Sequence, residues 1–441
     1  MPILRILCLN IGQRRPEDEM PKWGSYFGPI PNVERKHMNK GALAGIRIAD
    51  FSWAWAGSYA TELLAFLGAE VIKIESMRRP DHTRIRAFTT GQLFESLDQS
   101  YVFNHINLNK TSIRINLSKA KGIDLAKRLV GMSDVVAQNM RPGVMDRLGL
   151  GYEALKEVKS DIIYLSSSTR GSSGPEKGYA GYAPNFGALG GISYITGYEN
   201  GPPSYMRGEM DLLSAITGTF AVLAANHHRL ETGEGQHIDL SSSEAINSLI
   251  GEILVDYTMN GRVQSPQGNQ DEIMAPHNCY RCKGEDKWVS IAISDEEEWG
   301  AFCKAMGHPP WSAEQRFSTA LDRWENQEEM DGFIEKWTTN YTHYEVMEIL
   351  QNAGVAGIPS FNAEELMNDP HLAERNCWQE VDHPVMGKQA VVAPPWRLSD
   401  TPARITGPAP LFGEHSLSVF QELLGLSSEE IAGLEEEEVI Y

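Results

Sequence analysis

The chain has 441 residues and a formal net charge of −20, because 59 acidic residues outnumber 39 basic ones. A nucleic-acid-binding face needs clustered lysine and arginine, which this sequence lacks, so we expect no nucleic-acid partner. No apolar run approaches the roughly 20 residues that cross a bilayer, so we expect no membrane span.

The cysteines indicate the compartment. Five of them give no disulfide framework, and their odd number fits a reducing cytoplasm: Cys8, Cys279, Cys282, Cys303 and Cys377. The charged stretch over residues 13–20 offers no cleavage site for a signal peptide. His277 lies near two of the cysteines, but a structural zinc site takes four ligands, and packed or surface thiols are the simpler interpretation. We therefore expect a cytoplasmic protein without a metal.

Residues 1–41 are polar and punctuated by proline, glycine and charge, and we interpret them as an N-terminal extension. A regular pattern starts at residue 42. Residues 45–50 predict a buried strand, residues 59–67 an apolar helix and residues 70–75 a second strand, with Gly68 as the glycine that ends the helix. Together these segments predict a βαβ unit.

The alternation continues with helices predicted over 121–132 and 144–158, and strands over 134–138 and 161–166. Short loops between alternating strands and helices indicate a parallel sheet covered on both faces, so we expect an α/β fold with a doubly wound parallel sheet. A long apolar helix over 211–229, a strand over 237–240 and a helical stretch over 243–259 complete this large part, residues 42–260.

A smaller α+β unit is predicted over residues 261–355. Its predicted elements are a strand pair, 278–281 and 288–293, and helices around 296–306 and 327–338. Residues 356–441 are irregular and rich in proline, and they end in a short predicted helix over 416–424.

The turn from Asp50 to Ser58 is the first candidate site. It follows the first strand, and open α/β sheets bind ligands at the carboxyl ends of their strands. Its small residues would let an anionic ligand approach the amides that begin the next helix, and two tryptophans, Trp53 and Trp55, lie in the same turn. The glycine fingerprint of a dinucleotide site is missing. A tight strand-to-helix turn explains the same residues equally well.

Asp211 is the second candidate, because it stands at the predicted start of the long apolar helix. Aspartate is a favoured residue for capping a helix, and on the residues alone capping is the stronger interpretation. A carboxylate can also serve as a covalent nucleophile in acyl transfer. The two roles compete, because a capping side chain turns its oxygens toward the helix.

A glycine- and tyrosine-rich stretch precedes Asp211, over residues 182–191 and 196–203. Glycines permit close backbone approach to a ligand, and free backbone amides can stabilise an oxyanion. An ordered connection with several turns accounts for the same composition.

Four segments in order carry a resemblance to a known family. They are residues 43–51 with the Leu-Gly-Ala-Glu-Val-Ile-Lys-Ile-Glu sequence at 67–75, Asn-Met-Arg-Pro-Gly and the following residues at 139–149, residues 196–203 with Asp211, and Thr-Gly-Glu-Gly-Gln at 232–236. The tail adds matches at 357–359, 368–370 and 411–415. Together they resemble the class III CoA-transferases, a family that includes formyl-CoA:oxalate CoA-transferase, carnitine CoA-transferase and α-methylacyl-CoA racemase.

The resemblance implies both a mechanism and a set of site residues. The catalytic aspartate of the family falls on Asp211, which would attack an acyl-CoA thioester and form a mixed anhydride and then an aspartyl-CoA thioester. CoA and acyl-CoA would be substrates, and no permanently bound cofactor is expected. The implied CoA contacts are Trp53, Ala54, Trp55, Ala56, Ile115, Asn139, Met140, Arg147 and Tyr182, with Arg147 suited to a phosphate.

Departures from the family pattern bear on the substrate. Tyr182 stands where the racemases have a histidine, which favours a transferase over the alternative, an α-methylacyl-CoA racemase. Trp55 stands where the oxalate enzyme has a glutamine, which predicts a larger and more apolar acid. We expect an acid such as benzylsuccinate, with succinyl-CoA as the donor. Ser76 replaces an arginine that binds CoA phosphate, with Arg78 and Arg79 as possible substitutes.

The resemblance also implies the assembly. In this family a large CoA-binding domain is completed by a C-terminal segment, here residues 356–441, that returns to it past the small domain. Two chains interlock like linked rings, so we expect a homodimer or a heteromer with a homologous subunit. A non-catalytic partner subunit of such a heteromer is a further alternative.

Overall fold

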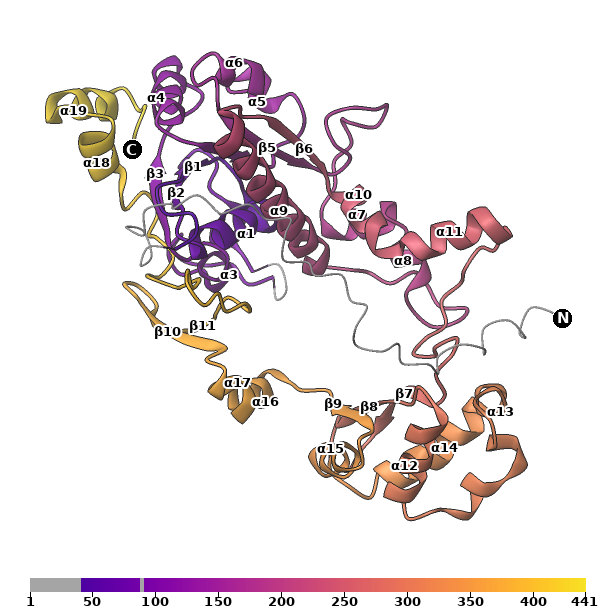
Figure 1. The fold of residues 1–441 in the computed structure, drawn as a ribbon. Helices are drawn as coiled ribbons and strands as arrows, with labels where there is room; N and C mark the ends of the chain where they lie inside the picture. Colours follow the sequence, from indigo (N-terminus) through magenta and orange to yellow (C-terminus); the bar gives the residue numbers. More distant parts are fainter. Residues whose placement is uncertain (1–40, 88–90) are drawn as a thin grey trace, which may run out of the picture. The chain divides into compact units, whose positions relative to one another are not determined.

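Six parallel strands form the main sheet of the computed structural model, which describes residues 41–87 and 91–441. The strand order is β3-β2-β1-β4-β5-β6 (Figure 1). The chain therefore builds outward from β1 in one direction and then returns to add β4 on the other side. The strands are β1 Arg47–Asp50, β2 Glu70–Glu75, β3 Lys110–Arg114, β4 Val135–Gln138, β5 Ile163–Ser168 and β6 His237–Ser241. The order reverses between β1 and β4, and such a switch point is where open sheets bind ligands.

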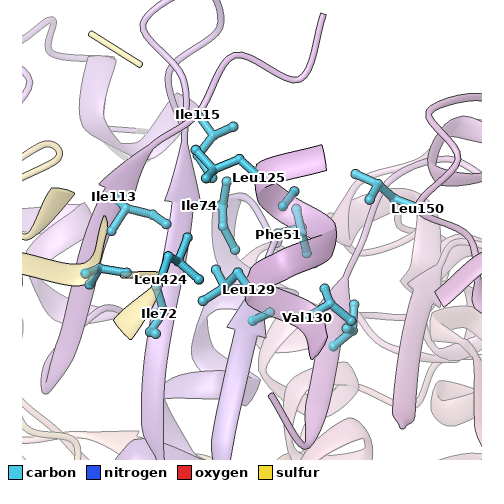
Figure 2. Packing of buried hydrophobic residues seen from close by; sticks show 14 of the residues in the cluster. Phe51, Ile72, Ile74, Ile113, Ile115, Leu125, Leu129, Val130, Leu150 and Leu424 are labelled. Carbon is cyan, nitrogen blue, oxygen red and sulfur yellow. The ribbon is translucent and has the colours of Figure 1, made fainter. Parts of the chain in front are cut away.

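One face of the sheet packs against the helices α4 (Ala120–Gly131), α5 (Val144–Arg147) and α6 (Tyr152–Lys156). Apolar side chains of β1, β2 and β3 meet Leu125, Leu129 and Val130 of α4 in one buried cluster (Figure 2). The C-terminal part of the chain belongs to the same cluster through residues such as Phe420 and Leu424. Its helical elements are α18 Ser416–Ser418, the π-helix Val419–Leu423 and α19 Ser428–Glu436.

The opposite face packs against α1 (Ala54–Phe66) and α9 (Gly208–Thr232). Leu64 and Ala65 of α1, with Val222 and Ala225 of α9, cover apolar residues of β1, β2, β4 and β5. The length and apolar composition of α9 would also suit a membrane span. Its packing on the sheet accounts for part of that composition, because a core helix needs the same kind of residues on its buried face.

Most of the predicted elements are present with shifted ends. The glycine expected to end the first helix, Gly68, does so at a φ of 98°, in the left-handed region. The predicted helix over 144–158 is wrong as a single element, because it is divided into α5 and α6. Gly149 has a φ of 68° and reverses the chain between them, and Gly151 lies directly against Asp146.

Shorter helices lie between these strands or follow β6. They are α2 His82–Ile85, α3 Tyr101–His105, α7 Ala183–Leu189, α8 Ile192–Ile195, α10 Ser242–Asn247, a 3₁₀ turn Ser248–Ile250 and α11 Gly251–Asn260. The stretch around 182–191, predicted as a glycine-rich loop, is mostly helical in α7. The Thr-Gly-Glu-Gly-Gln motif ends α9, because Gly233 adopts φ 77° there and Gly235 lies against the backbone of residues 161–162.

A separate three-stranded antiparallel sheet has the order β7-β8-β9. Its strands are β7 His277–Arg281, β8 Trp288–Ala292 and β9 Ala356–Pro359. It shares its own apolar core with helices α12 Glu296–Ala305, α14 Gln327–Thr338 and α15 His343–Asn352, and α13 Ala320–Glu325 and 3₁₀ turns at Pro310–Ala313 and Gln315–Phe317 complete this region. β9 belongs to this sheet although it lies beyond the expected boundary at residue 355.

The chain then forms α16 (Ala363–Asn368), α17 (Pro370–Glu374) and an antiparallel hairpin of β10 (Trp378–His383) and β11 (Gly387–Val392). Val381 and Val391 of the hairpin pack with Leu63 and Phe66 of α1. The C-terminal segment therefore packs on both sides of the main sheet. Its hairpin packs against α1, and its last helices pack into the cluster that includes α4.

Candidate active site

The turn between β1 and α1 lies at the switch point of the sheet. Trp53 precedes the first helical residue and contributes no side-chain cap to α1, and the first turn of α1 has no acidic residue. Ala54 has a φ of 53°, a left-handed conformation that is unfavourable for alanine. The sequence therefore adopts a conformation here that its own residues do not prefer.

Asn139 holds the backbone of Trp53 from the end of β4. The Trp53 amide donates to Oδ1 of Asn139 at 2.8 Å, and Nδ2 of Asn139 donates back to the Trp53 carbonyl oxygen at 2.7 Å. Gly57 makes this approach possible, because a Cβ at that position would lie 2.9 Å from Cγ of Asn139 and 2.4 Å from Cβ of Ser52. Asn139, predicted as a CoA contact, thus also orients the turn.

Two buried ion pairs lie beneath the turn. Nζ of Lys73 lies 3.3 Å from Oδ2 of Asp81, and Nζ of Lys110 lies 3.1 Å from Oδ2 of Asp50. All four side chains are buried, so each charge needs its partner. Asp50 also accepts hydrogen bonds from the Ser52 amide and hydroxyl and from the Thr61 hydroxyl.

These contacts and burial shift the pKa values of several ionisable groups in the cluster. Burial would raise the pKa of Asp50, but Lys110, Lys73 and the hydroxyl donors outweigh burial and lower it. Burial lowers the pKa of Lys110 to about 8, with Asp50 opposing the shift. Burial raises the pKa of Glu62, the remaining acid of the cluster, well above its ordinary value. Two aspartates and two lysines thus balance one another beside Glu62, whose carboxylate accepts a hydrogen bond from the Leu108 amide at 2.9 Å.

A cavity of about 440 Å³ opens beside this turn, at the carboxyl ends of β1, β2, β3 and β4. Three residues predicted to bind CoA line it together: Trp53, Ile115 and Met140. Arg78 and Arg79, the expected substitutes for a missing arginine, line it as well. The cavity therefore combines apolar walls with cationic groups, which suits an anionic ligand that carries an apolar or aromatic portion.

Aromatic contacts order both tryptophans of the turn. The guanidinium carbon of Arg79 lies 4.7 Å from the centre of the Trp53 ring, and His82 meets the same ring edge-on at 5.8 Å. Trp55 in the first turn of α1 packs edge-on against His105 at 5.9 Å between ring centres. Each tryptophan is held by side chains from α2, α3 or the loop after β2.

Asp211 lies in the first turn of α9 but caps nothing. The helix starts at Gly208, so Asp211 is already inside it, and the preference for a capping role was wrong. Within the part of the chain that the structure describes, its carboxylate has no hydrogen-bond or ion-pair partner. Burial raises the pKa of Asp211 to about 7. A carboxylate without a partner, kept basic by its surroundings, has the properties of a nucleophile.

The packing of two helices sets the level of Asp211. α1 follows β1 and α9 precedes β6, so both run opposite to the parallel strands and parallel to each other. The hydroxyl of Thr219 lies 3.1 Å from the carbonyl oxygen of Ala60, which fixes their register. Asp211 precedes Thr219 by eight residues, about 12 Å of helix. Ala60 follows the Trp53–Ala54 turn by six to seven residues, about 10 Å of helix, so this register puts Asp211 near the level of that turn.

The remaining predicted residues, like Asp211, are not among those that line the cavity. Ala54 and Ala56 lie in the first turn of α1 with Trp55. Arg147 is exposed at the end of α5, next to residues of the cavity wall. Tyr182 is exposed and precedes α7, and it is not among the residues that line the cavity. Their roles toward CoA stay predictions.

The sequence interpretation missed Lys73, Asp81 and Lys110. A lysine in the middle of the apolar strand Val-Ile-Lys-Ile is the one signal that could have indicated a buried ionic contact, because an unpaired charge is costly there. Its partner Asp81 stands in a different loop and could not be assigned from spacing alone.

Comparison with known proteins decides the family. The sequence model described as CoA-transferase family III matches residues 43–416. This chain belongs to CoA-transferase family III. The resemblance stated from the motifs is therefore confirmed, and the chain is a CoA-transferase of this family.

Similar proteins span nearly the whole chain. It is 32% identical over 401 residues to succinyl-CoA–D-citramalate CoA-transferase of Chloroflexus aurantiacus, covering 90% of this chain and 98% of the relative. It is 33% identical over 392 residues to succinyl-CoA:mesaconate CoA-transferase of Haloarcula marismortui, covering 87% and 96%. A crystal structure of a CaiB/BaiF family protein from Brucella suis superposes with a TM-score of 0.79 at 26% identity, covering 87% of this chain and all of that one.

Proposed function

We propose that this chain transfers CoA from succinyl-CoA to a substituted four-carbon dicarboxylic acid through covalent intermediates on Asp211. The observation that carries the proposal is the state of the Asp211 carboxylate. It is unpartnered among the described residues, its pKa is raised to about 7, and the helix register brings it level with the turn beside the cavity.

The proposed reaction begins and ends with one thioester, which is broken in succinyl-CoA and formed again in the acceptor's CoA ester. A carboxylate oxygen of Asp211 attacks the succinyl carbonyl carbon, the carbon–sulfur bond breaks, and CoA leaves as a thiolate with the electron pair. The thiolate then attacks the Asp211 acyl carbon, which releases succinate and leaves an aspartyl-CoA thioester. The acceptor carboxylate attacks this thioester, and the released thiolate attacks the acceptor's acyl carbon. Acceptor-CoA departs and Asp211 returns to a free carboxylate.

CoA enters this cycle as part of a substrate, and the proposal requires no resident cofactor. Arg78 and Arg79 would attract its phosphates, while the apolar wall with Trp53, Ile115 and Met140 would receive the less polar parts. The local cationic groups matter because the chain as a whole carries a net charge of −20.

The acceptor class follows from two lines of support. The relatives named above act on citramalate and mesaconate, which are both methyl-substituted four-carbon dicarboxylates. Benzylsuccinate, the acid expected from the sequence, has the same backbone with a larger substituent. Trp55 in the first turn of α1 offers apolar surface for the substituent rather than a polar group for a bare oxalate. We therefore propose a succinate-like backbone whose substituent meets Trp55.

Assembly into pairs is part of the proposal. No residue of α11 is buried within the described chain, although the helix carries Leu254, Val255, Tyr257 and Met259 on its surface. Phe220 of α9 is 72% exposed. Apolar helical surface of this extent is typical of a protein interface. We propose that a second copy covers it in a homodimer. The alternative is a heteromer with a homologous subunit. The oligomeric state of the chain expressed and purified alone distinguishes the two.

The function is tested with purified protein and a panel of acceptors: mesaconate, citramalate, malate, benzylsuccinate and oxalate. Succinyl-CoA and each acid are incubated, and the new CoA ester is identified by mass spectrometry. Transfer to at least one substituted succinate-type acid, lost in Asp211→Asn while free CoA still binds, supports the proposal. Deuterium entry from solvent at the α-carbon of an acyl-CoA without any acceptor would instead favour a racemase. Transfer only after mixing with another chain would favour the partner-subunit alternative.

A further inference from the structure

The two buried ion pairs beneath the β1–α1 turn need an explanation other than stability. Buried pairs of this kind contribute little net stability relative to apolar side chains, because removing the charges from water offsets their attraction. Lys73 and Asp81 are both essentially inaccessible to solvent. Their contacts with neighbouring backbone groups are more informative than their contact with each other.

Asp81 and Lys73 hold the turn from two directions. The amide nitrogen of Ala54 lies 3.1 Å from both carboxylate oxygens of Asp81. Nζ of Lys73 donates to the carbonyl oxygen of Ser52 at 2.8 Å and to the Ser58 hydroxyl at 3.1 Å. The carboxylate therefore binds the donor at one end of the turn while the ammonium binds the acceptor at the other.

The residue that Asp81 holds has the left-handed backbone. Ala54 adopts φ 53°, which an alanine keeps only where surrounding contacts over-determine it. Its neighbour Trp53 lines the cavity, and its other neighbour, Trp55, lies in the first turn of α1. If Ala54 relaxed to an ordinary conformation, both tryptophans would change direction together.

We propose that Asp81, with Lys73 as its charge partner, is a positioning residue for CoA transfer, which holds Ala54 in its left-handed conformation and thereby aims Trp53 and the first turn of α1 at the reacting thioester. This inference rests on the proposed function. It assigns a role in the reaction to a buried residue that does not line the cavity.

A purely structural role for Asp81 is the competing explanation. Asp81 also caps α2, accepting from the amide of Thr83 at 2.9 Å and from its hydroxyl at 2.8 Å. Loss of the cap would affect folding, whereas loss of the Ala54 contact would affect the geometry of the turn. The two roles are separated by a substitution at Ala54, because glycine adopts a positive φ without penalty.

The experiment compares two variants that both remove the ion pair and leave no unpaired buried charge. Lys73→Met with Asp81→Asn keeps an oxygen that can accept from Ala54, and Lys73→Met with Asp81→Leu does not. We expect kcat for CoA transfer to fall by about a hundredfold more in the leucine variant, the scale of loss for a small misplacement of reacting groups. Adding Ala54→Gly to the leucine variant is expected to recover about tenfold of that loss, because glycine at position 54 adopts the positive φ without help from Asp81.

Asn376→Gly is the matched control for the rescue. Asn376 also has a positive φ, 51°, but lies between α17 and β10, so the same relief of backbone strain there should restore nothing. Thermal unfolding is measured for every variant. Equal kcat in the asparagine and leucine variants, or rescue by Asn376→Gly as large as by Ala54→Gly, overturns the inference.

A failure to fold is also informative. If the leucine variant is unfolded and Ala54→Gly does not restore its folding, Asp81 acts through the fold and the positioning role is wrong. The proposed function fails separately, since it requires the unmodified protein to transfer CoA before any of these variants is compared.

Discussion

The hydroxyl of Thr219 lies 3.1 Å from the carbonyl oxygen of Ala60, which ties the middle of α9 to the middle of α1. The same hydroxyl lies 2.9 Å from the carbonyl oxygen of Ala215 in its own helix. Because both helices run in the same direction, this single contact relates their starts. Asp211 on one helix and the Trp53–Ala54 turn on the other consequently share one level at the carboxyl edge of the sheet.

The transfer rate is expected to depend on the ionisation of Asp211. Its pKa is raised to about 7 by burial, and only the carboxylate form can attack a thioester. With succinyl-CoA well below saturation, kcat/KM should rise about tenfold per pH unit below pH 7 and become constant above it. A steady-state profile between pH 5.5 and pH 8.5 checks this, and a flat profile across that range would contradict it.

The free energy of unfolding should fall with rising pH, whereas the transfer rate should rise. A carboxyl whose pKa is about 7 in the folded state and about 3.8 in the unfolded state keeps its proton longer when folded. The free energy of unfolding therefore loses this contribution as pH rises from about 4 to about 7. Asp211→Asn removes the ionisation, so it should be more stable than the natural chain at pH 8 and equal to it near pH 4. Urea titrations at both values measure the difference, which must vary with pH if Asp211 is responsible.

Gly57→Ala should disturb the turn without adding any charge. The new methyl group would lie 2.4 Å from Cβ of Ser52 and 2.9 Å from Cγ of Asn139, so Asn139 would be pushed away from the Trp53 backbone. We expect a loss of about 1–3 kcal/mol in the free energy of unfolding, typical of overpacking, and a weaker binding of CoA.

Gly300→Ala is the control, since it lies within α12 and a methyl group there would meet nothing within 4 Å. This substitution should be neutral or slightly stabilising, because glycine is unfavourable inside helices. Calorimetric titration with CoA and thermal unfolding of both variants test the comparison. Equal CoA affinity in the two variants would mean that the packing of Gly57 does not affect CoA binding.

The C-terminal segment should be required for the stability of the main sheet. Phe420 is completely buried in the cluster that includes strands β1, β2 and β3, whereas Leu417 is 57% exposed three residues earlier. Phe420→Ala should lower the free energy of unfolding by about 3–5 kcal/mol, and Leu417→Ala should change it by less than about 0.5 kcal/mol. Chemical denaturation measures both. Similar values for the two variants would mean that the segment is not part of that core.

Several of these features were accessible from the sequence. The first βαβ unit follows from its apolar periods and Gly68, and the family follows from motifs that keep their order over the chain. β3 was not predicted, because Lys-Thr-Ser-Ile-Arg has one apolar residue and its lysine is buried only by virtue of tertiary contacts with Asp50, Ser58, Thr61 and Asn107. The division of 144–158 depends on the contact of Gly151 with Asp146, which hydrophobic periodicity does not reveal.

The site was predicted less completely than the fold. Trp53, Ile115 and Met140 line one cavity, and their contact with CoA stays a prediction. The other predicted site residues are not among those that line it: Ala54, Trp55, Ala56, Asn139, Arg147, Tyr182 and Asp211. Asp211 was favoured as a cap because the helix was predicted to begin at that residue, and a start three residues earlier removes this role. The Lys73–Asp81 pair joins positions on different loops, and its partners are defined only once the strands are in register.

The most direct test is chemical capture of the intermediate on residue 211. The protein is mixed with succinyl-CoA, treated with borohydride or hydroxylamine, digested and examined by peptide mass spectrometry beside Asp211→Asn. We predict a modified Asp211 peptide that appears only with the acyl-CoA and only in the natural chain. An unmodified Asp211 peptide in protein that is actively transferring CoA would contradict the covalent role of this residue.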